Sequence, residues 1–421
     1  MQERSDSAGY INMISAREPV YPLFLALFRL VFREGYLFAV IIFQAMLAGF
    51  SAWLISERIA KSCCTGKYTV YGFYAVHAGV ALICQFLSER GAVYSNSILT
   101  EGIALSLWLI YMYLVFRVVE DCDLYSLLGA LILAAVMTDI RKQLAVSWIA
   151  LMMSVFFGRL GRDDKKSWFR RLYITLALCI VSIFAALMGT RIYNSVLRGD
   201  FAANTRDMNL VLTTSLYVAD REDADLIEEE RVRELFLQTM DRLEESGSNI
   251  RFAGDSLREL EEHYEEHYDI ITIDTTKDLF VEYAVGQGMQ EGFEAEQEAD
   301  RYSTVIVKSL IKDNLPKYIR IYAANFLNGC VNTVAKRNSL LDIYAAAIIA
   351  VYLVLMGICL AKGMSAGRFG LCVLMAILAN TGVTAALIFC QTRYMIYNMP
   401  LFYMAGLSML DALITGRAKK R

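Results

Sequence analysis

Two adjacent cations stand in a short polar turn between two apolar stretches of the chain. The turn reads TDIRKQ, residues 138–143, and places Arg141 directly before Lys142. Arginine binds a phosphate through forked hydrogen bonds, and lysine binds it as a point charge. Any turn needs polar residues, but that need does not explain two neighbouring cations. We therefore interpret Arg141 and Lys142 as a phosphate-binding pair.

A third cation lies at the start of the last long apolar stretch. The segment CQTRYMIYNMPLF, residues 390–402, carries Arg393 followed by Tyr394. An arginine that extends to the water interface and a tyrosine at that interface are both common in membrane proteins without any catalytic role. Together with Arg141 and Lys142, however, Arg393 completes a set of three cations that could converge on one phosphate.

Two carboxylates are candidates for acid–base chemistry, and the first is Glu101. It stands in LTEGIALSL, at the start of an apolar stretch and beside Thr100. One interpretation is structural: an acid in the first turn suits the helix dipole, and Ser95, Asn96 or Ser97 would cap the helix. The other interpretation is functional, with the Glu101 carboxylate facing a cavity.

The second carboxylate, Asp6, lies in SDSAGYINMISAREPVYPLF near the start of the chain. If this segment is helical, Asp6 and Tyr10 share a face, and Arg17 and Glu18 follow two turns later. A carboxylate within hydrogen-bond reach of a hydroxyl group can remove its proton as the hydroxyl oxygen attacks. A stray exposed aspartate is the default in a free tail, but an amphipathic helix predicted over 19–33 would hold this one at a surface.

The elements that must position these residues are apolar helices. The chain has 421 residues, of which 56% are hydrophobic, and its mean hydropathy is +0.40. A membrane span needs about 20 apolar residues. The chain therefore reads as an all-α polytopic membrane protein with about nine transmembrane helices. These are predicted at 35–56, 69–87, 98–116, 124–138, 143–157, 172–189, 340–361, 369–389 and 394–415.

The distribution of Lys and Arg predicts the orientation. Basic residues gather at 57–67, 158–171, 362–368 and 416–421, and all four segments fall on one side of the predicted membrane. The positive-inside rule makes that side cytoplasmic, although the short acidic loop 117–123 falls there too. The segments on the opposite, extracytoplasmic side are then 1–34, 88–97, 139–142, 190–339 and 390–393. Every candidate acid and cation lies on this extracytoplasmic side.

The predicted spans and orientation divide the chain into four parts. Residues 1–34 form an external loop with an interfacial amphipathic helix, and 35–189 form an N-terminal transmembrane bundle. Residues 190–339 form a mainly helical extracytoplasmic block, and 340–421 contain the last spans and a basic tail. Within the block, an apolar stripe predicts a helix, and YDIITIDTT shows a short strand-like alternation. The stripe is formed by Leu226, Val232, Leu235, Phe236, Met240 and Leu243.

Other classes of site have little support. The net charge of −3 gives no reason to expect a nucleic-acid partner, and of nine cysteines only Cys330 lies clearly in the block. That distribution excludes a disulfide framework there, and no cysteine or histidine cluster suggests structural zinc. His263 and His267 have a spacing that could bind a metal, but an acidic helix face exposed to water explains them better. We predict no specific metal site, although a divalent metal remains possible.

Four motifs in order resemble those of the GT-C membrane glycosyltransferases. The N-terminal segment DSAGYINMISAREPVYPLFLAL is similar to the first extracytoplasmic loop of that superfamily, which carries an Asp and a nearby aromatic residue. The later motifs read LTEGIALSL, DIRKQLAV and RYMIYNMP. The nearest branch contains the lipid A aminoarabinose transferase, the rhizobial lipopolysaccharide-core transferases and the protein O-mannosyltransferases. The resemblance covers the chain except the block, which varies within the family.

The chain departs from the family at its start. The family has one transmembrane helix before the first loop, so we expect a leading helix that this sequence lacks. The loop also carries a single acid, Asp6, with Ser7 where the family often has a second one. Glu101 is then the candidate for the second acidic group.

The resemblance implies an inverting glycosyltransferase. It would move a sugar from a polyprenyl-phosphate donor to a glycan, lipid or protein acceptor at the outer face of the cytoplasmic membrane. It implies Asp6 as the base and Glu101 as an orienting acid. Arg141, Lys142 and Arg393 would form the phosphate clamp. The expected substrate-binding residues are Tyr10, Arg17, Thr100 and Tyr394.

Two other functions compete with this one. A transporter or flippase of lipid-linked sugars also needs charged groups near lipid, but it should show repeats and helices broken at mid-depth. The chain has four prolines and no visible repeat. An inert scaffold built around the block would leave Arg141 and Lys142 unexplained.

Overall fold

Helices form all the regular structure in the described residues of the computed structural model, which are 6–87, 94–158, 165–205, 207–336 and 338–416. The segments 88–97, 158–171 and 416–421, used above to predict orientation, lie partly outside these residues. The strand-like alternation of YDIITIDTT does not correspond to a strand, because Ile270–Lys277 continue α11 as a π-helix. Its period-two alternation is too short to overcome the helical segments on both sides.

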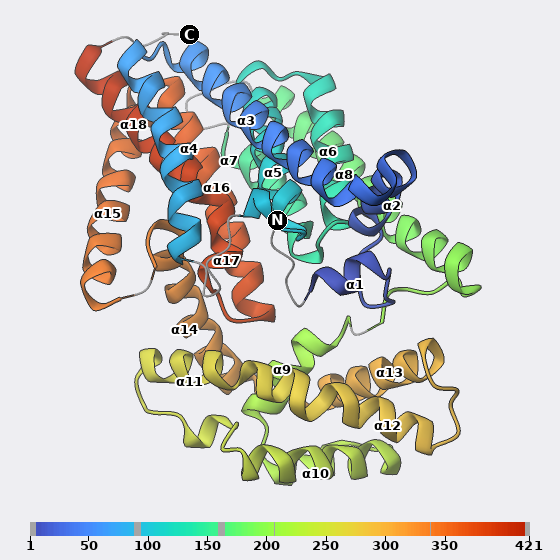
Figure 1. Ribbon diagram of the computed structural model, residues 1–421. Coiled ribbons are helices and arrows are strands. Elements are labelled where there is room, and N and C mark those ends of the chain that lie inside the picture. The colour runs from blue at the N-terminus through green and yellow to red at the C-terminus, as the bar shows by residue number, and fades with distance from the viewer. Residues whose placement is uncertain (1–5, 88–93, 159–164, 206, 337, 417–421) are drawn as a thin grey trace. The chain divides into compact units, whose positions relative to one another are not determined.

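The chain forms two compact units. The first comprises residues 1–202, 330–381 and 392–421, and the second comprises 203–329 and 382–391. In the first unit the helices (Figure 1) are α1 (Ser7–Ile11), α2 (Val20–Phe32), α3 (Tyr36–Cys63), α4 (Lys67–Leu87), α5 (Glu101–Asp121), α6 (Leu124–Thr138), α7 (Val146–Phe157), α8 (Lys165–Arg198), α15 (Ser339–Ala361), most of α16 (Ser365–Leu387), α17 (Thr392–Met395) and α18 (Met399–Thr415). Short 3-10 turns occur at Arg33–Gly35, Tyr94–Asn96, Lys142–Ala145 and Ile396–Asn398.

Five helical stretches in the described residues are long and apolar enough to cross a membrane. They are Val20–Cys63, Glu101–Asp121, Trp168–Arg198, Leu340–Ala361 and Ser365–Leu387. The predicted short spans form α6 and α7, which are apolar but below that length. The structure therefore fits a membrane protein, whereas the count of nine spans and the orientation stay predictions.

Helix α5 lies among other helices of the first unit and packs against α3, α6 and α7. Its side chains Trp108, Tyr111 and Phe116 are fully buried. A helix that is apolar on all sides is expected to be buried within a bundle. The two ends of α5 nevertheless carry buried acids, Glu101 and Glu120, and each acid has arginine partners.

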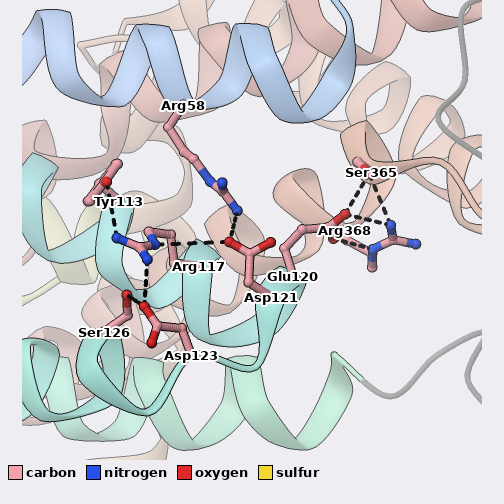
Figure 2. A network of polar contacts seen from close by, with 9 residues as sticks. All are labelled: Arg58, Tyr113, Arg117, Glu120, Asp121, Asp123, Ser126, Ser365 and Arg368. Atoms are coloured by element: carbon pink, nitrogen blue, oxygen red, sulfur yellow. Dashed lines mark hydrogen bonds and ion pairs between the residues drawn. The ribbon is translucent and has the colours of Figure 1, made fainter. Parts of the chain in front are cut away.

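The network at the C-terminal end of α5 ties this helix to its neighbours (Figure 2). Glu120 accepts hydrogen bonds from Arg368 Nε at 2.6 Å and from Ser365 Oγ at 2.8 Å, both on α16. Asp121 pairs with Arg58 of α3 at 2.6 Å. The buried charge of Glu120 needs such partners because burial removes its water.

The second unit has its own apolar core. Its helices are α9 (Asn209–Val218), α10 (Glu230–Glu245), α11 (Leu257–Asp269), α12 (Asp278–Gly286), α13 (Phe293–Leu310) and part of α14 (Leu315–Val334), with 3-10 turns at Arg221–Leu226 and Ile250–Phe252. The predicted apolar stripe is confirmed on α10, where Val232, Leu235, Phe236, Met240 and Leu243 are buried. Leu226 is the exception, since it precedes the helix and is 38% exposed.

Candidate functional site

Glu101 is the first residue of α5, and its side chain is fully buried. Thr100 occupies the N-cap position, but its hydroxyl donates a hydrogen bond to Glu101 Oε2 at 3.2 Å instead of accepting one from the backbone. The expectation that Ser95, Asn96 or Ser97 caps this helix is wrong. Those residues lie in or next to a separate 3-10 turn that ends before the helix begins.

Two guanidinium groups neutralise the buried Glu101 carboxylate. Arg141 donates through Nη1 and Arg393 donates through Nε, both to Glu101 Oε1. Arg141 follows α6 and Arg393 belongs to α17, so three distant segments meet here. An ionised carboxylate without water needs such partners. The structure thus brings together three of the predicted site residues.

Asp6 joins the same cluster through Arg393. The Asp6 carboxylate accepts hydrogen bonds from Arg17 Nη2 at 2.7 Å and from Arg393 Nη2 at 3.5 Å. Arg393 therefore contacts both candidate acids. Burial raises the pKa of Asp6, but the guanidinium groups of Arg17 and Arg393 outweigh this effect and hold the pKa below its usual value. Asp6 is accordingly ionised at neutral pH.

The N-terminal segment is docked through hydrogen bonds from the first residue of α1 and from residues that follow this helix. Ser7 Oγ donates to the Ile98 carbonyl at 2.8 Å, and Arg198 Nη2 donates to the Met13 carbonyl at 2.7 Å. The Val20 amide donates to the Asp139 carbonyl at 2.9 Å. These contacts hold Asp6 in place in front of α5.

The two predicted aromatic residues pack against the arginines. Arg17 lies over the Tyr10 ring at 4.7 Å, and Arg141 lies over the Tyr394 ring at 4.9 Å. Tyr10 is 6% exposed and also meets Tyr21 edge to face. In this structure Tyr10 holds Arg17 beside Asp6, and its expected part in substrate binding stays a prediction.

Lys142 does not share the Arg141 contact with Glu101. Its Nζ lies 3.5 Å from Glu18 Oε1. The backbone at Arg141 is extended, with φ −158°, and successive side chains of an extended backbone point in opposite directions. The structure therefore places Lys142 beside Glu18, while Arg17 joins Arg393 at Asp6, and the predicted clamp of Arg141, Lys142 and Arg393 stays a prediction.

Reasoning from the sequence missed a buried polar pair next to Glu101. Gln44 of α3 and Tyr21 of α2 are both fully buried. Tyr21 donates to Gln44 Oε1 at 3.1 Å, and Gln44 Nε2 donates to the carbonyls of Ser95 and Ser97 at 3.2 and 3.1 Å. A single glutamine inside an apolar span is costly, and that cost was the signal that could have identified it.

The carboxyl group of Asp139 leads to a prediction about how the stability of the protein depends on pH. Burial and the nearby Glu18 raise the pKa of Asp139 to about 7, against the opposing effects of Thr190 and Lys142. The folded chain then keeps a proton that the unfolded chain loses, so the free energy of unfolding falls as pH rises from about 4 to about 7. We expect Asp139→Asn to raise the thermal midpoint more at about pH 8 than at about pH 5. An equal change at both pH values would contradict this assignment.

The site has an excess of positive charge. Arg17, Arg141 and Arg393 supply three positive charges, and Asp6 and Glu101 supply two negative ones, which leaves one positive charge. The side chains of Asp6 and Arg393 are 33% and 28% exposed. This arrangement can bind an anion next to an ionised carboxylate.

Metal ligands do not gather in the described parts of the chain, where no three His, Cys, Asp or Glu side chains are placed to hold a metal ion. His263 and His267 stack with their ring centroids 4.1 Å apart. The Nδ1 atom of His263 lies 3.0 Å from the Tyr217 hydroxyl, and that of His267 lies 2.8 Å from the His263 carbonyl. These contacts account for the spacing of the two histidines.

Comparisons of the chain with protein-family models, curated proteins and solved structures find no match. The resemblance to the GT-C superfamily therefore rests on the quoted motifs alone. The geometry of the site is the separate basis for the proposal that follows.

Proposed function

We propose that this protein is an inverting glycosyltransferase that uses a polyprenyl-phosphate sugar at the outer face of the cytoplasmic membrane. The observation that carries the proposal is the position of Arg393 between Asp6 and Glu101. It joins a candidate base and a candidate phosphate clamp within one cluster of the first unit. A displacement reaction needs these two functions side by side.

The reaction would proceed as a single displacement. The acceptor hydroxyl oxygen forms a bond to the anomeric carbon of the sugar while the bond from that carbon to the phosphate oxygen breaks. Asp6 takes the hydroxyl proton, and the lipid phosphate leaves with the bonding electrons. Arg141 and Arg393 stabilise the negative charge that develops on the phosphate.

Binding of the donor would also strengthen the base. In the free protein, Arg17 and Arg393 lower the pKa of Asp6 and make it a weak proton acceptor. A phosphate that attracts Arg393 would leave Asp6 with Arg17 as its remaining cationic contact in the cluster. The pKa of Asp6 would then rise when the donor is in place.

An apolar cavity of about 330 Å³ in the first unit supports a lipid substrate. It lies between α4, the end of α14, α15 and α18, and Lys336 is also part of its lining. Cavities of this size accommodate part of a small-molecule ligand. The lining residue Met399 follows Arg393 by six positions along the chain. The main apolar lining residues are Val76, Val80, Val334, Leu341, Met399 and Tyr403.

The test is a transfer assay in membranes that contain the protein. Radiolabelled polyprenyl-phosphate sugars are supplied, and the label is followed into lipid, glycan and protein fractions. We expect label to appear in one acceptor fraction, and not in membranes without the protein. Movement of labelled donor across the bilayer without transfer would instead favour the flippase alternative and reject the proposed reaction.

A further inference from the structure

Tyr397 is a buried residue close in sequence to Arg393. It lies in the 3-10 turn Ile396–Asn398 that connects α17 to α18, and it is 2% exposed. Its hydroxyl oxygen is inaccessible to solvent and has no hydrogen-bond partner among the described residues. Most buried polar groups in proteins have such a partner, so this hydroxyl needs an explanation.

The next residue, Asn398, also carries a buried polar atom without a hydrogen-bond partner among the described residues. Asn398 is fully buried, and its Oδ1 atom accepts a hydrogen bond from Trp108 Nε1 at 3.0 Å. Because the indole N–H can only donate, this bond fixes the orientation of the amide. The Asn398 Nδ2 atom then has no acceptor in the described part of the chain. Two consecutive residues thus each carry a buried donor group without an acceptor.

Charged residues of the candidate site surround the Tyr397 hydroxyl. Arg141, Glu101 and Arg393 all act on it electrostatically, and Arg141 approaches the hydroxyl oxygen as a donor, but an arginine cannot accept the hydroxyl proton. Trp108 packs against the Tyr397 ring edge to face, with the centroids 6.3 Å apart. The ring is therefore held by packing, and its hydroxyl is held near the cationic groups without an acceptor.

An unpaired buried hydroxyl destabilises the free protein, because its desolvation is not compensated. Residues that reduce stability in this way are expected at functional sites. The two arginines beside Tyr397 are already the groups proposed to bind a phosphate. A phosphate oxygen is a hydrogen-bond acceptor and is the complement of a neutral donor in this position.

We propose that the Tyr397 hydroxyl is a phosphate-binding group, which donates a hydrogen bond to an oxygen of the lipid phosphate when Arg141 and Arg393 contact that phosphate. This assignment deepens the proposed function and rests on it for the identity of the anion. It adds a neutral donor to the clamp. The hydrogen bond from such a donor orients the phosphate, and it does so without a further buried charge.

The test uses Tyr397→Phe in the full chain, purified in detergent. The substitution removes only the hydroxyl, so we expect the thermal midpoint of the ligand-free protein to rise. We expect affinity for a polyprenyl phosphate to fall by about 10-fold to 100-fold, as for a lost hydrogen bond to a charged group. Polyprenol, which lacks the phosphate, should bind the variant and the unaltered protein equally.

The matched control is Tyr352→Phe. The Tyr352 hydroxyl is also buried, but it donates to the Gly370 carbonyl at 2.7 Å. Its removal should lower the thermal midpoint and leave the affinity for polyprenyl phosphate unchanged. A purely structural role for Tyr397 would give this same pattern and would overturn the inference.

The two proposals can fail separately. If the unaltered protein binds polyprenyl phosphate and Tyr397→Phe weakens that binding, but no sugar transfer occurs, the inference stands and the proposed reaction fails. If sugar transfer occurs and Tyr397→Phe binds polyprenyl phosphate with unchanged affinity, the inference alone is wrong. If the unaltered protein does not bind polyprenyl phosphate, both proposals are rejected.

Discussion

Asp6→Asn is expected to lower the rate of sugar transfer by about 100-fold to 10,000-fold, the usual contribution of a general base. The amide keeps the size of the side chain and can still accept a hydrogen bond from Arg17, but it cannot take the proton of the acceptor hydroxyl. Because Asp6 is 33% exposed, loss of its ion pairs should change stability little. Initial rates in membranes and the thermal midpoint of the purified protein measure the two effects.

Asp123→Asn is the matched control for this variant. Asp123 also accepts short hydrogen bonds, from Arg117 and Ser126 at 2.6 Å each, but it belongs to the network at the other end of α5 (Figure 2). We expect its substitution to leave the transfer rate within about twofold, as for surface changes away from a site. Full transfer activity in Asp6→Asn would show that another group is the base.

Glu101→Gln is expected to reduce the free energy of unfolding by about 3–5 kcal/mol, the usual cost of removing one partner from a buried ion pair. The Arg141 and Arg393 guanidinium groups would lose the charge that neutralises them. The same change raises the net charge of the cluster, so an added anion should replace the missing carboxylate. We expect inorganic phosphate to raise the thermal midpoint of this variant more than that of the unaltered protein.

Glu120→Gln tests whether this rescue is specific. Glu120 is the other buried glutamate of α5 and pairs with Arg368 and Ser365. Its substitution should lower stability for the same physical reason, because Arg368 loses its counter-charge. Phosphate should not restore the stability of this variant beyond its effect on the unaltered protein. Equal rescue of both variants would mean that phosphate acts non-specifically and that Glu101 does not mark an anion site.

The sequence was sufficient to predict the helical class and several helices individually. Hydrophobic runs and periodicity depend on local spacing, and they predicted both α5 and the apolar face of α10. The types and positions of Glu101, Arg141 and Arg393 also indicated them as candidate site residues. The strand-like alternation within Ile270–Lys277 was misleading, because a short alternation carries little information compared with the flanking helices.

Only the tertiary structure decided which charges meet. Arg393 contacts both Asp6 and Glu101, although 387 and 292 residues separate them along the chain. Lys142 contacts Glu18 because the extended backbone at Arg141 turns the two neighbouring side chains apart. The buried, unpaired hydroxyl of Tyr397 was equally invisible in the sequence. Ionic partners are chosen by distances of a few ångströms between segments, and those distances exist only once the helices have packed.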